Sequence, residues 1–190
     1  MLKPMFAAAA SLSAAVLLHH TSHADGEELV RVASSLRLAT ARKIADGALS
    51  EGRTHSMHPL AVVVLDSGGH VVVSMREDGC GVLRSDIALA KAYGSLSMGM
   101  STRQLRDRLA GRPYFLASLV ATSEGRMAPA PGGVLVLDQG NIAIGAVGVS
   151  GDTSERDEFV AITAVHAAGL RSAPGEPAEG WQSSSLSGHR

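Results

Sequence analysis

The sequence predicts an α+β domain in which an antiparallel sheet is flanked by helices on both faces, giving α/β/α layers. The expected elements come in the order helix, hairpin, helices, hairpin, helix, and two hairpins separated by helices favour one antiparallel sheet. A length of 190 residues suits a single domain. Hydrophobic residues at 45% and charged residues at 18% exclude a highly charged, disordered chain.

The first helix and the first hairpin follow from the spacing of apolar residues. Apolar side chains recur at helical spacing over 29–51, and Gly52 is a suitable stop. The β-branched runs 60–66 and 70–75 predict two strands joined by a tight Asp-Ser-Gly-Gly turn. The first run is apolar on both faces, so we expect it to be covered on both sides.

Three helices are expected between the hairpins. Ser85 is suited to cap a helix over 85–98 that carries small residues on one face for close packing. Ser101 is the expected N-cap of a short helix over 102–110. A further one or two helical turns are expected over 115–122.

The second hairpin and the last helix complete the expected domain. A proline- and glycine-rich loop leads into a strand over 134–138, which turns back into a strand over 141–149. Asp152 is then the expected N-cap of the final helix, with Glu155 three residues later in a capping-box pattern. That helix is expected to end near Gly169.

The two ends differ from the central domain, which we place at 29–171. The leader 1–28 holds an apolar run of 13 residues at 6–18, too short to span a membrane but similar to a secretory signal with cleavage after Ala24. An exported and a cytoplasmic protein both remain open. The tail 172–190 is rich in Pro, Gly and Ser and is expected to be flexible.

Composition limits the class of partner. The formal net charge is -1, from 17 basic and 18 acidic residues, so the chain lacks the positive field that holds a nucleic-acid backbone. Aromatic residues at 3% leave few platforms for stacking single strands. Cys80 is the only cysteine, which excludes an internal disulfide and any multi-cysteine metal site.

No motif in the sequence identifies a catalytic residue. Cys80 lies among glycines with no neighbouring base, so a turn residue is favoured over a nucleophile. His55 and His58 lie in a connection, where solvated histidines are favoured over two ligands of a metal. Four acidic residues begin the last helix, where negative charge is favourable in its own right, so we predict no metal site there: Asp152, Glu155, Asp157 and Glu158.

Two cations stand out on the helix 85–98. Lys91 lies among apolar and small residues, so its side chain either extends to solvent or meets an anionic ligand. Arg84 precedes the same helix, and together the two side chains are suited to hold a carboxylate. Met98 and Met100 are soft apolar groups that suit an irregular pocket or a core.

Several short runs occur in an order that resembles one known family. They are Arg76-Glu77-Asp78-Gly79, Ile87-Ala88-Leu89-Ala90-Lys91-Ala92, Pro131-Gly132-Gly133-Val134, Gly145-Ala146-Val147-Gly148-Val149-Ser150-Gly151 and Asp157-Glu158. Over about residues 30–172 the chain is similar to the GlcG/HbpS family, also called the haem-degrading domain family. The resemblance implies a profilin-like fold and a homo-oligomer. It also implies haem as ligand, with a corrinoid as a further candidate through the related PduO C-terminal domain.

The resemblance and the residues together give a ligand hypothesis. A planar anionic ligand such as haem is expected beside the helix 85–98, where Gly132 and Gly133 allow close approach to the backbone. Lys91 and Arg84 would bind its carboxylates. The family resemblance implies Thr102 as a candidate to face the iron, and a methionine is the alternative.

Two other functions stay open at this point. The same pocket and cations suit an accessory protein or enzyme that acts on a small carboxylate or in aromatic catabolism. A protein-interaction scaffold is the third alternative, by analogy with other profilin-like folds. Self-association is expected in each case, because residues 85–100 and 115–149 carry little charge.

Overall fold

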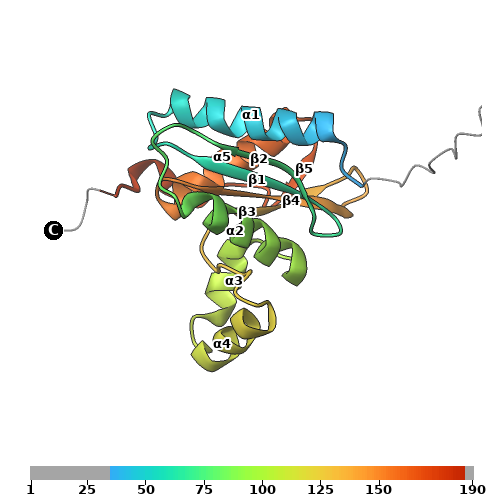
Figure 1. The fold of residues 1–190 in the computed structure, drawn as a ribbon, viewed down its shortest axis with the longest axis vertical. Coiled ribbons are helices and arrows are strands. Elements are labelled where there is room, and N and C mark those ends of the chain that lie inside the picture. Colours follow the sequence, from blue (N-terminus) through green and yellow to red (C-terminus); the bar gives the residue numbers. More distant parts are fainter. Residues whose placement is uncertain (1–34, 187–190) are drawn as a thin grey trace, which may run out of the picture. The chain divides into compact units, whose positions relative to one another are not determined.

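The fold is a five-stranded antiparallel sheet covered by helices on both faces, as the sequence predicted (Figure 1). The computed structural model describes residues 35–186. Neighbouring strands follow the order β2-β1-β4-β3-β5. The strands are β1 (Ala61–Asp66), β2 (Val71–Arg76), β3 (Gly133–Leu137), β4 (Ala143–Ser150) and β5 (Arg171–Ala173).

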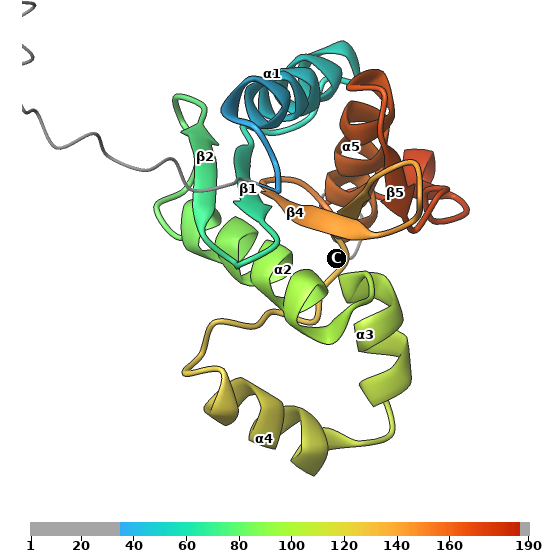
Figure 2. The same ribbon diagram turned by 90° about the vertical axis from the view of Figure 1, so that its right-hand side faces the viewer.

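The helices lie in two layers with one projecting pair. They are α1 (Leu38–Thr54), α2 (Arg84–Met98), α3 (Thr102–Leu109), α4 (Pro113–Thr122), α5 (Ser154–Ala167) and the short 3₁₀ turn η1 (Trp181–Ser183). Helices α1 and α5 cover one face of the sheet, and α2 covers the other (Figure 2). Helices α3 and α4 extend from the end of α2, away from the sheet.

Strand β1 shows why both faces of the sheet are filled. Val62 and Val64 pack into the cluster under α1 and α5, whereas Val63 and Leu65 pack into the cluster under α2. Because successive side chains of a strand point to opposite faces, a continuous apolar run suits only a strand with two covered faces. The prediction for this strand is therefore confirmed.

Helix α2 lies very close to the sheet because glycines face it. A Cβ built at Gly148 would collide with the carbonyl oxygen of Ala88, and one at Gly133 would collide with the carbonyl oxygen of Lys91. Ala88 and Ala92 are fully buried on the facing side of the helix. The predicted small-residue face of this helix is thus matched by a second small-residue surface on β3 and β4.

Three helix starts differ from the sequence prediction. Residues 35–37 are not helical, because Arg37 is extended, and the first helix begins at Leu38. Helix α2 begins at Arg84, after Leu83, so Ser85 lies inside the helix and does not cap it. The N-cap of α5 is Thr153, not Asp152. Asp152 instead accepts a hydrogen bond from the backbone N–H of Thr153, at 2.8 Å.

One predicted cap is confirmed in full. The Ser101 hydroxyl accepts a hydrogen bond from the backbone N–H of Gln104, and the Gln104 side chain accepts one from the backbone N–H of Ser101. This reciprocal capping box fixes the start of α3 directly after the end of α2. Gly99, in the left-handed conformation, ends α2 and turns the chain toward α3.

The segment after α5 is more ordered than the sequence suggested. A flexible tail was expected from residue 172, yet Arg171–Ala173 forms β5 and pairs with β3. Further on, the Trp181 ring stacks on Phe159 with ring centroids 3.5 Å apart. Pairing with the free edge of β3 and stacking on α5 hold a segment whose composition alone would leave it unstructured.

The predicted leader 1–28, with its signal-like run and the cleavage after Ala24, lies outside the described residues. Within residues 35–186, no helix is both long enough and apolar enough to cross a bilayer.

Candidate functional site

Lys91 is a buried residue, and its charge is matched inside the protein. Its side chain is only 3% exposed, and the ammonium donates hydrogen bonds to Asp157 Oδ2 at 2.8 Å and to the carbonyl oxygen of Val149 at 2.9 Å. The predicted alternative of a lysine that reaches solvent was therefore wrong, while its role toward an anionic ligand stays a prediction. The partner lies 66 positions away in the chain, and the ion pair joins α2 to α5.

Asp157 is held by both of its carboxylate oxygens. Oδ2 faces Lys91, while Oδ1 accepts a hydrogen bond from the backbone N–H of Asp152 at 3.0 Å. Burial raises the pKa of the Asp157 carboxyl, and the adjacent Lys91 ammonium opposes that rise. This ion pair thus connects α2, on one face of the sheet, to α5, on the other.

A second buried contact lies beside Lys91 and is formed by Thr102, Gly132 and Gly133. Thr102 is 0% exposed, and its Oγ1 accepts a hydrogen bond from the backbone N–H of Gly133 at 2.8 Å. A Cβ at Gly132 would lie 2.8 Å from the Lys91 ammonium, and its φ of 118° also favours glycine. The predicted grouping of these residues is correct, all three are buried in the isolated chain, and their role toward a ligand stays a prediction.

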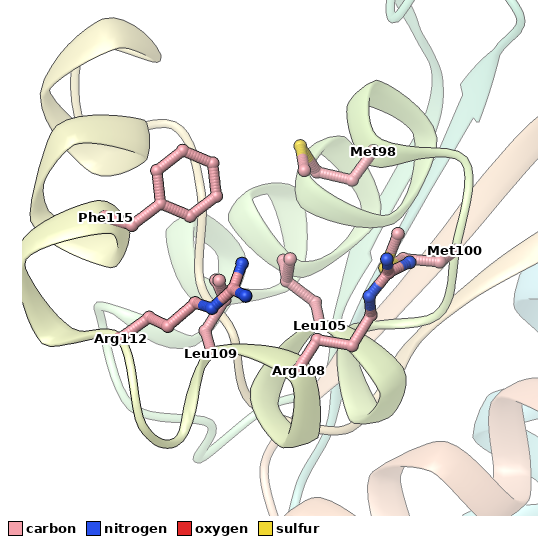
Figure 3. A pocket seen from close by; sticks show the side chains of 7 residues that line it. All are labelled: Met98, Met100, Leu105, Arg108, Leu109, Arg112 and Phe115. Atoms are coloured by element: carbon pink, nitrogen blue, oxygen red, sulfur yellow. The ribbon is translucent and has the colours of Figure 1, made fainter.

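A cavity lies some way from that cluster, between the end of α2, helix α3 and the start of α4 (Figure 3). Its volume is about 270 Å³. Five apolar residues and two arginines line it: Met98, Met100, Leu105, Leu109, Phe115, Arg108 and Arg112. Met98 and Phe115 point toward each other across the opening.

Arg108 and Arg112 give this cavity a positive edge. Both side chains are exposed, and neither forms an ion pair within the part of the chain that the structure describes. The nearest acid along α3, Asp107, is already engaged by Arg106, whose Nε lies 2.8 Å from its carboxylate. The two guanidinium groups are therefore available to an anionic ligand.

A second hollow adjoins the first and shares Met100 and Arg108 with it. It measures about 450 Å³ and is also lined by Gly99, Gln104 and Asp107. Both hollows are lined by residues of α3. Typical small-molecule sites range over ~300–1,000 Å³, so the combined space is of the right order for a ligand of cofactor size.

Helix α4 is held only loosely to the rest of the protein. None of its residues is fully buried, and Tyr114 is 90% exposed. Leu116 and Leu119 pack against a small cluster formed by Leu105, Leu109 and Met127. With so little buried surface, α4 has few contacts to lose if it moves away from α3.

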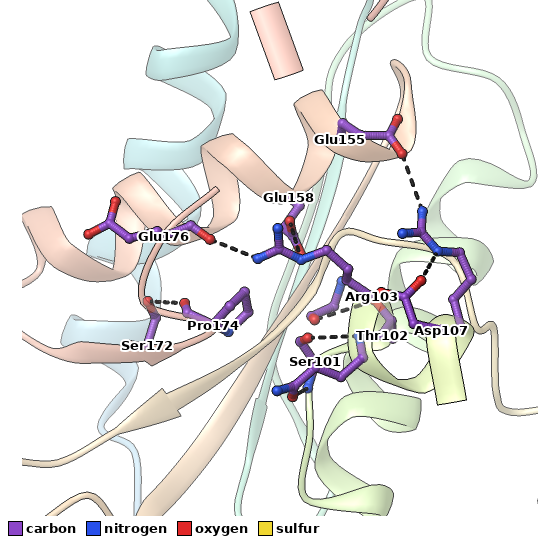
Figure 4. A network of polar contacts seen from close by, with 12 residues as sticks. Ser101, Thr102, Arg103, Asp107, Glu155, Glu158, Ser172, Pro174 and Glu176 are labelled. Carbon is purple, nitrogen blue, oxygen red and sulfur yellow. Dashed lines mark hydrogen bonds and ion pairs between the residues drawn. The ribbon is translucent and has the colours of Figure 1, made fainter. Parts of the chain in front are cut away.

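The acidic residues at the start of α5 are all engaged by cations, and Figure 4 shows two of them, Glu155 and Glu158. The four pairs are Asp152–Arg156, Glu155–Arg106, Asp157–Lys91 and Glu158–Arg103. Within residues 35–186, no group of three or more His, Cys, Asp or Glu side chains is placed to hold a metal. Burial raises the pKa of Glu158 to about 7, although Arg103 opposes this rise.

The cysteine and the two predicted loop histidines do not form a catalytic group. Cys80 is buried, and burial raises the pKa of its thiol, which disfavours the reactive thiolate. His55 lies 3.0 Å from Glu51 and meets the rings of Phe159 and Trp181 edge-on. It is thus a packing residue and not the solvated loop histidine that the sequence suggested.

The antiparallel sheet with helices on both faces defines a class of α+β domains that several solved structures share. The family of haem-degrading HbpS-like proteins matches residues 36–166, and the chain belongs to this family. The resemblance seen in the sequence is therefore confirmed. An uncharacterised 15.0 kDa protein from Citrobacter freundii, encoded between dhaT and dhaS, is 33% identical over 132 residues, covering 70% of this chain and 91% of that protein.

Solved structures give the same result for the fold. The ORFY protein of Klebsiella pneumoniae is 29% identical with a TM-score of 0.64, over 75% of this chain and 96% of that one. A double mutant of HbpS from Streptomyces reticuli is 27% identical with a TM-score of 0.61, over 84% and 97%. A PduOC:heme complex, at 24% identity and a TM-score of 0.65 over 73% and 98%, shows the shared fold alone.

Proposed function

We propose that this protein binds haem, or a closely related tetrapyrrole, in the cavity between α2, α3 and α4. The observation that carries the proposal is the combination of apolar walls with two unpaired arginines at one edge. Membership of a family of haem-degrading proteins supports the choice of haem among planar anionic ligands. Binding is the function we propose, and it leaves open whether a reaction follows.

The residues present fit the chemistry of haem. A porphyrin offers two apolar faces and two propionate groups on one edge, so it needs an apolar slot beside cations. Leu105, Leu109 and Phe115 supply the apolar walls, and Arg108 and Arg112 are suited to the propionates. A volume of about 270 Å³ accepts part of the ring, and the adjoining hollow accommodates more of it.

Met98 is the residue that we propose to face the iron. Its thioether lies on the cavity wall opposite Phe115 (Figure 3), and methionine is a known axial ligand of haem iron. Thr102, by contrast, is fully buried, and its hydroxyl oxygen accepts a hydrogen bond from the backbone N–H of Gly133. When bound, haem would supply a redox-active iron, while the chain would orient the ring and neutralise its propionates.

Hemin titration of the protein tests this proposal directly. We expect a saturable Soret band, with affinity reduced at least ~10-fold in an Arg108→Gln/Arg112→Gln double variant, because two charge-assisted hydrogen bonds of ~1.5–3 kcal/mol each are weakened. Arg42→Gln on the exposed face of α1 is the matched control and should bind as the wild type does. No saturable band in the wild type would overturn the proposal.

A second titration separates the iron ligand from the rest of the site. Met98→Leu keeps the size and apolar character of the side chain but removes the sulfur, so it should shift the Soret maximum while leaving most of the affinity. An unshifted spectrum would exclude Met98 as the ligand. A corrinoid in competition with hemin tests the alternative tetrapyrrole in the same cavity.

Self-association is part of the same proposal, since the chain exposes apolar side chains. Tyr114, Val82 and Leu83 are all strongly exposed in the isolated chain, and exposed apolar groups of this size are typical of interaction surfaces. Light scattering at micromolar concentration should give a mass that is a multiple of 19.5 kDa. A monomer under these conditions would contradict it.

A further inference from the structure

We propose a second ligand site, for a small monocarboxylate, in a separate cavity of about 610 Å³ at the start of α5. Its walls come from three parts of the chain: Arg84 at the start of α2, residues 152–155 around the first turn of α5, and residues 183–186 of the C-terminal segment. Met98, Arg108 and the other residues of the proposed haem site do not line it.

Arg84 supplies the positive charge. It is partly buried, and its Nη1 lies 3.4 Å from the hydroxyl oxygen of Ser150. Among the described residues, no carboxylate lies within ion-pair distance of the Arg84 guanidinium. The carboxylate of Asp157 pairs with Lys91 instead. A guanidinium on a cavity wall without an acidic partner is suited to bind a carboxylate through two parallel hydrogen bonds.

The first turn of α5 supplies donors on the same wall. The N-cap Thr153 makes no side-chain capping bond, so the N–H groups of the first turn are not satisfied by a cap. Thr153 is 8% exposed, and its Oγ1 has no hydrogen-bond partner in the described region. A buried hydroxyl without a partner is costly unless a ligand or water engages it, and a helix N-terminus favours an anion.

The acidic residues beside the cavity indicate which ligand charge it can accept. Asp152 Oδ2 accepts a hydrogen bond from His58 N–H at 2.9 Å, and its Oδ1 lies 3.5 Å from Arg156. Glu155 lies 3.4 Å from Arg106 and accepts a hydrogen bond from the Ser184 hydroxyl. Both carboxylates are thus compensated, and Arg84 remains to balance one negative charge. This favours a monoanion over phosphate or a dicarboxylate.

The C-terminal segment contains Trp181, whose fluorescence can report binding in this cavity. Ser184 bonds to Glu155, and three residues earlier Trp181 stacks on Phe159. Trp181 is the only tryptophan of the chain. A ligand that contacts the wall formed by residues 183–186 therefore changes the surroundings of a single fluorophore.

Titration with acetate, lactate and benzoate, followed by Trp181 fluorescence and by calorimetry, tests the proposal. We expect saturable binding of at least one of them at millimolar concentration, weakened at least ~10-fold by Arg84→Gln and several-fold by Thr153→Val. Arg42→Gln is again the control and should not change it. Because Thr153→Val removes only the hydroxyl, it keeps the test valid if Arg84→Gln fails to fold.

The outcomes separate this site from the haem site. Arg84→Gln should leave the hemin titration unchanged, and Arg108→Gln/Arg112→Gln should leave carboxylate binding unchanged. Absence of saturable monocarboxylate binding, or equal binding by the Arg84→Gln variant, would overturn the proposal. Tighter binding of phosphate or succinate than of any monocarboxylate would overturn the assigned ligand class.

Discussion

The layered core and the α3–α4 pair both contain apolar and basic side chains, but the core buries and pairs them, whereas the α3–α4 pair leaves several of them exposed. In the core, Val62, Val64 and Ala88 are fully buried, and the one lysine of α2 is neutralised internally by Asp157. In the α3–α4 pair, apolar side chains remain exposed, and arginines lie at the edge of a cavity without acidic partners. Burial and pairing make the first region rigid, whereas the second keeps its binding groups available.

The comparison also shows why a charged residue on an apolar helix is an ambiguous signal. A lysine among small residues suits a ligand site and a buried ion pair equally well, and only the position of its partner decides between them. Here α2 lies very close to the sheet, and the partner of the buried lysine comes from α5. Sites for ligands lie where packing is incomplete.

The largest expected effect is the loss of the ion pair in the core. Asp157→Ala leaves the Lys91 ammonium buried and unpaired, which should lower the free energy of unfolding by about 3–5 kcal/mol. Urea unfolding measures this loss. The Lys91→Met/Asp157→Leu double variant should recover most of the stability, because it removes both buried charges. A loss below about 1 kcal/mol in the single variant would show that the pair contributes little.

The second effect is a pH dependence that arises where the core meets α3. Glu158 is fully buried, and burial raises its pKa from 4.5 to about 7. The folded protein therefore holds this proton to higher pH than the unfolded chain, so stability falls as pH rises from about 4.5 to 7. The decrease reaches up to ~3 kcal/mol.

Glu158→Gln is the matched variant for this pH effect, because it keeps the shape of the side chain and removes the titrating group. Thermal or urea unfolding between pH 4.5 and 8 should give a shallower decrease in stability for this variant than for the wild type. Identical slopes would assign the pH dependence to another group.

The third effect contrasts one glycine in each region. Gly148→Ala places a methyl group against the backbone of α2 and should cost about 1–3 kcal/mol of stability. Gly111→Ala, between α3 and α4, meets nothing within 4 Å and should change stability by less than about 1 kcal/mol. Equal costs in urea unfolding would contradict the difference in packing between the two regions.

The smallest effect should come from α4. Leu116→Ala removes a partly buried contact with α3 and should lower global stability by less than about 1 kcal/mol. Hydrogen exchange should show α4 amides exchanging well before those of α2, and faster still in the variant. Equal protection of the two helices would contradict the loose attachment of α4.

The sequence was a good guide to the elements and a poor one to the site. Hydrophobic spacing and turn residues predicted both hairpins, the covered strand β1 and Ser101 as an N-cap, because these depend on neighbours in the chain. The ion pair between Lys91 and Asp157 depends on two helices meeting across the sheet. No local pattern specifies that contact.

Arg108 and Arg112 were missed for a related reason. Arg108 lies on a short polar helix and Arg112 lies just before α4, and arginines at such places are typical of a solvated surface, so nothing in residues 102–112 marks them as part of a cavity. A signal did exist in the unusually apolar α4 that follows, since an apolar helix next to a strongly basic one predicts a surface with both characters. From the sequence, Met98 suited either an irregular pocket or a core, and the structure places it on the cavity wall.

Strand β5 has a further consequence for how this chain avoids aggregation. It pairs with the outer edge of β3, whose sequence Gly-Val-Leu-Val-Leu would otherwise present unpaired backbone groups on an apolar strand. Such edges pair readily with strands of other molecules. Because the family match ends at residue 166, edge protection here comes from residues beyond the matched region. A chain cut before Arg171 would expose an aggregation-prone strand edge while keeping Arg108 and Arg112 of the proposed haem site, and it would lose the wall that residues 183–186 give to the second cavity.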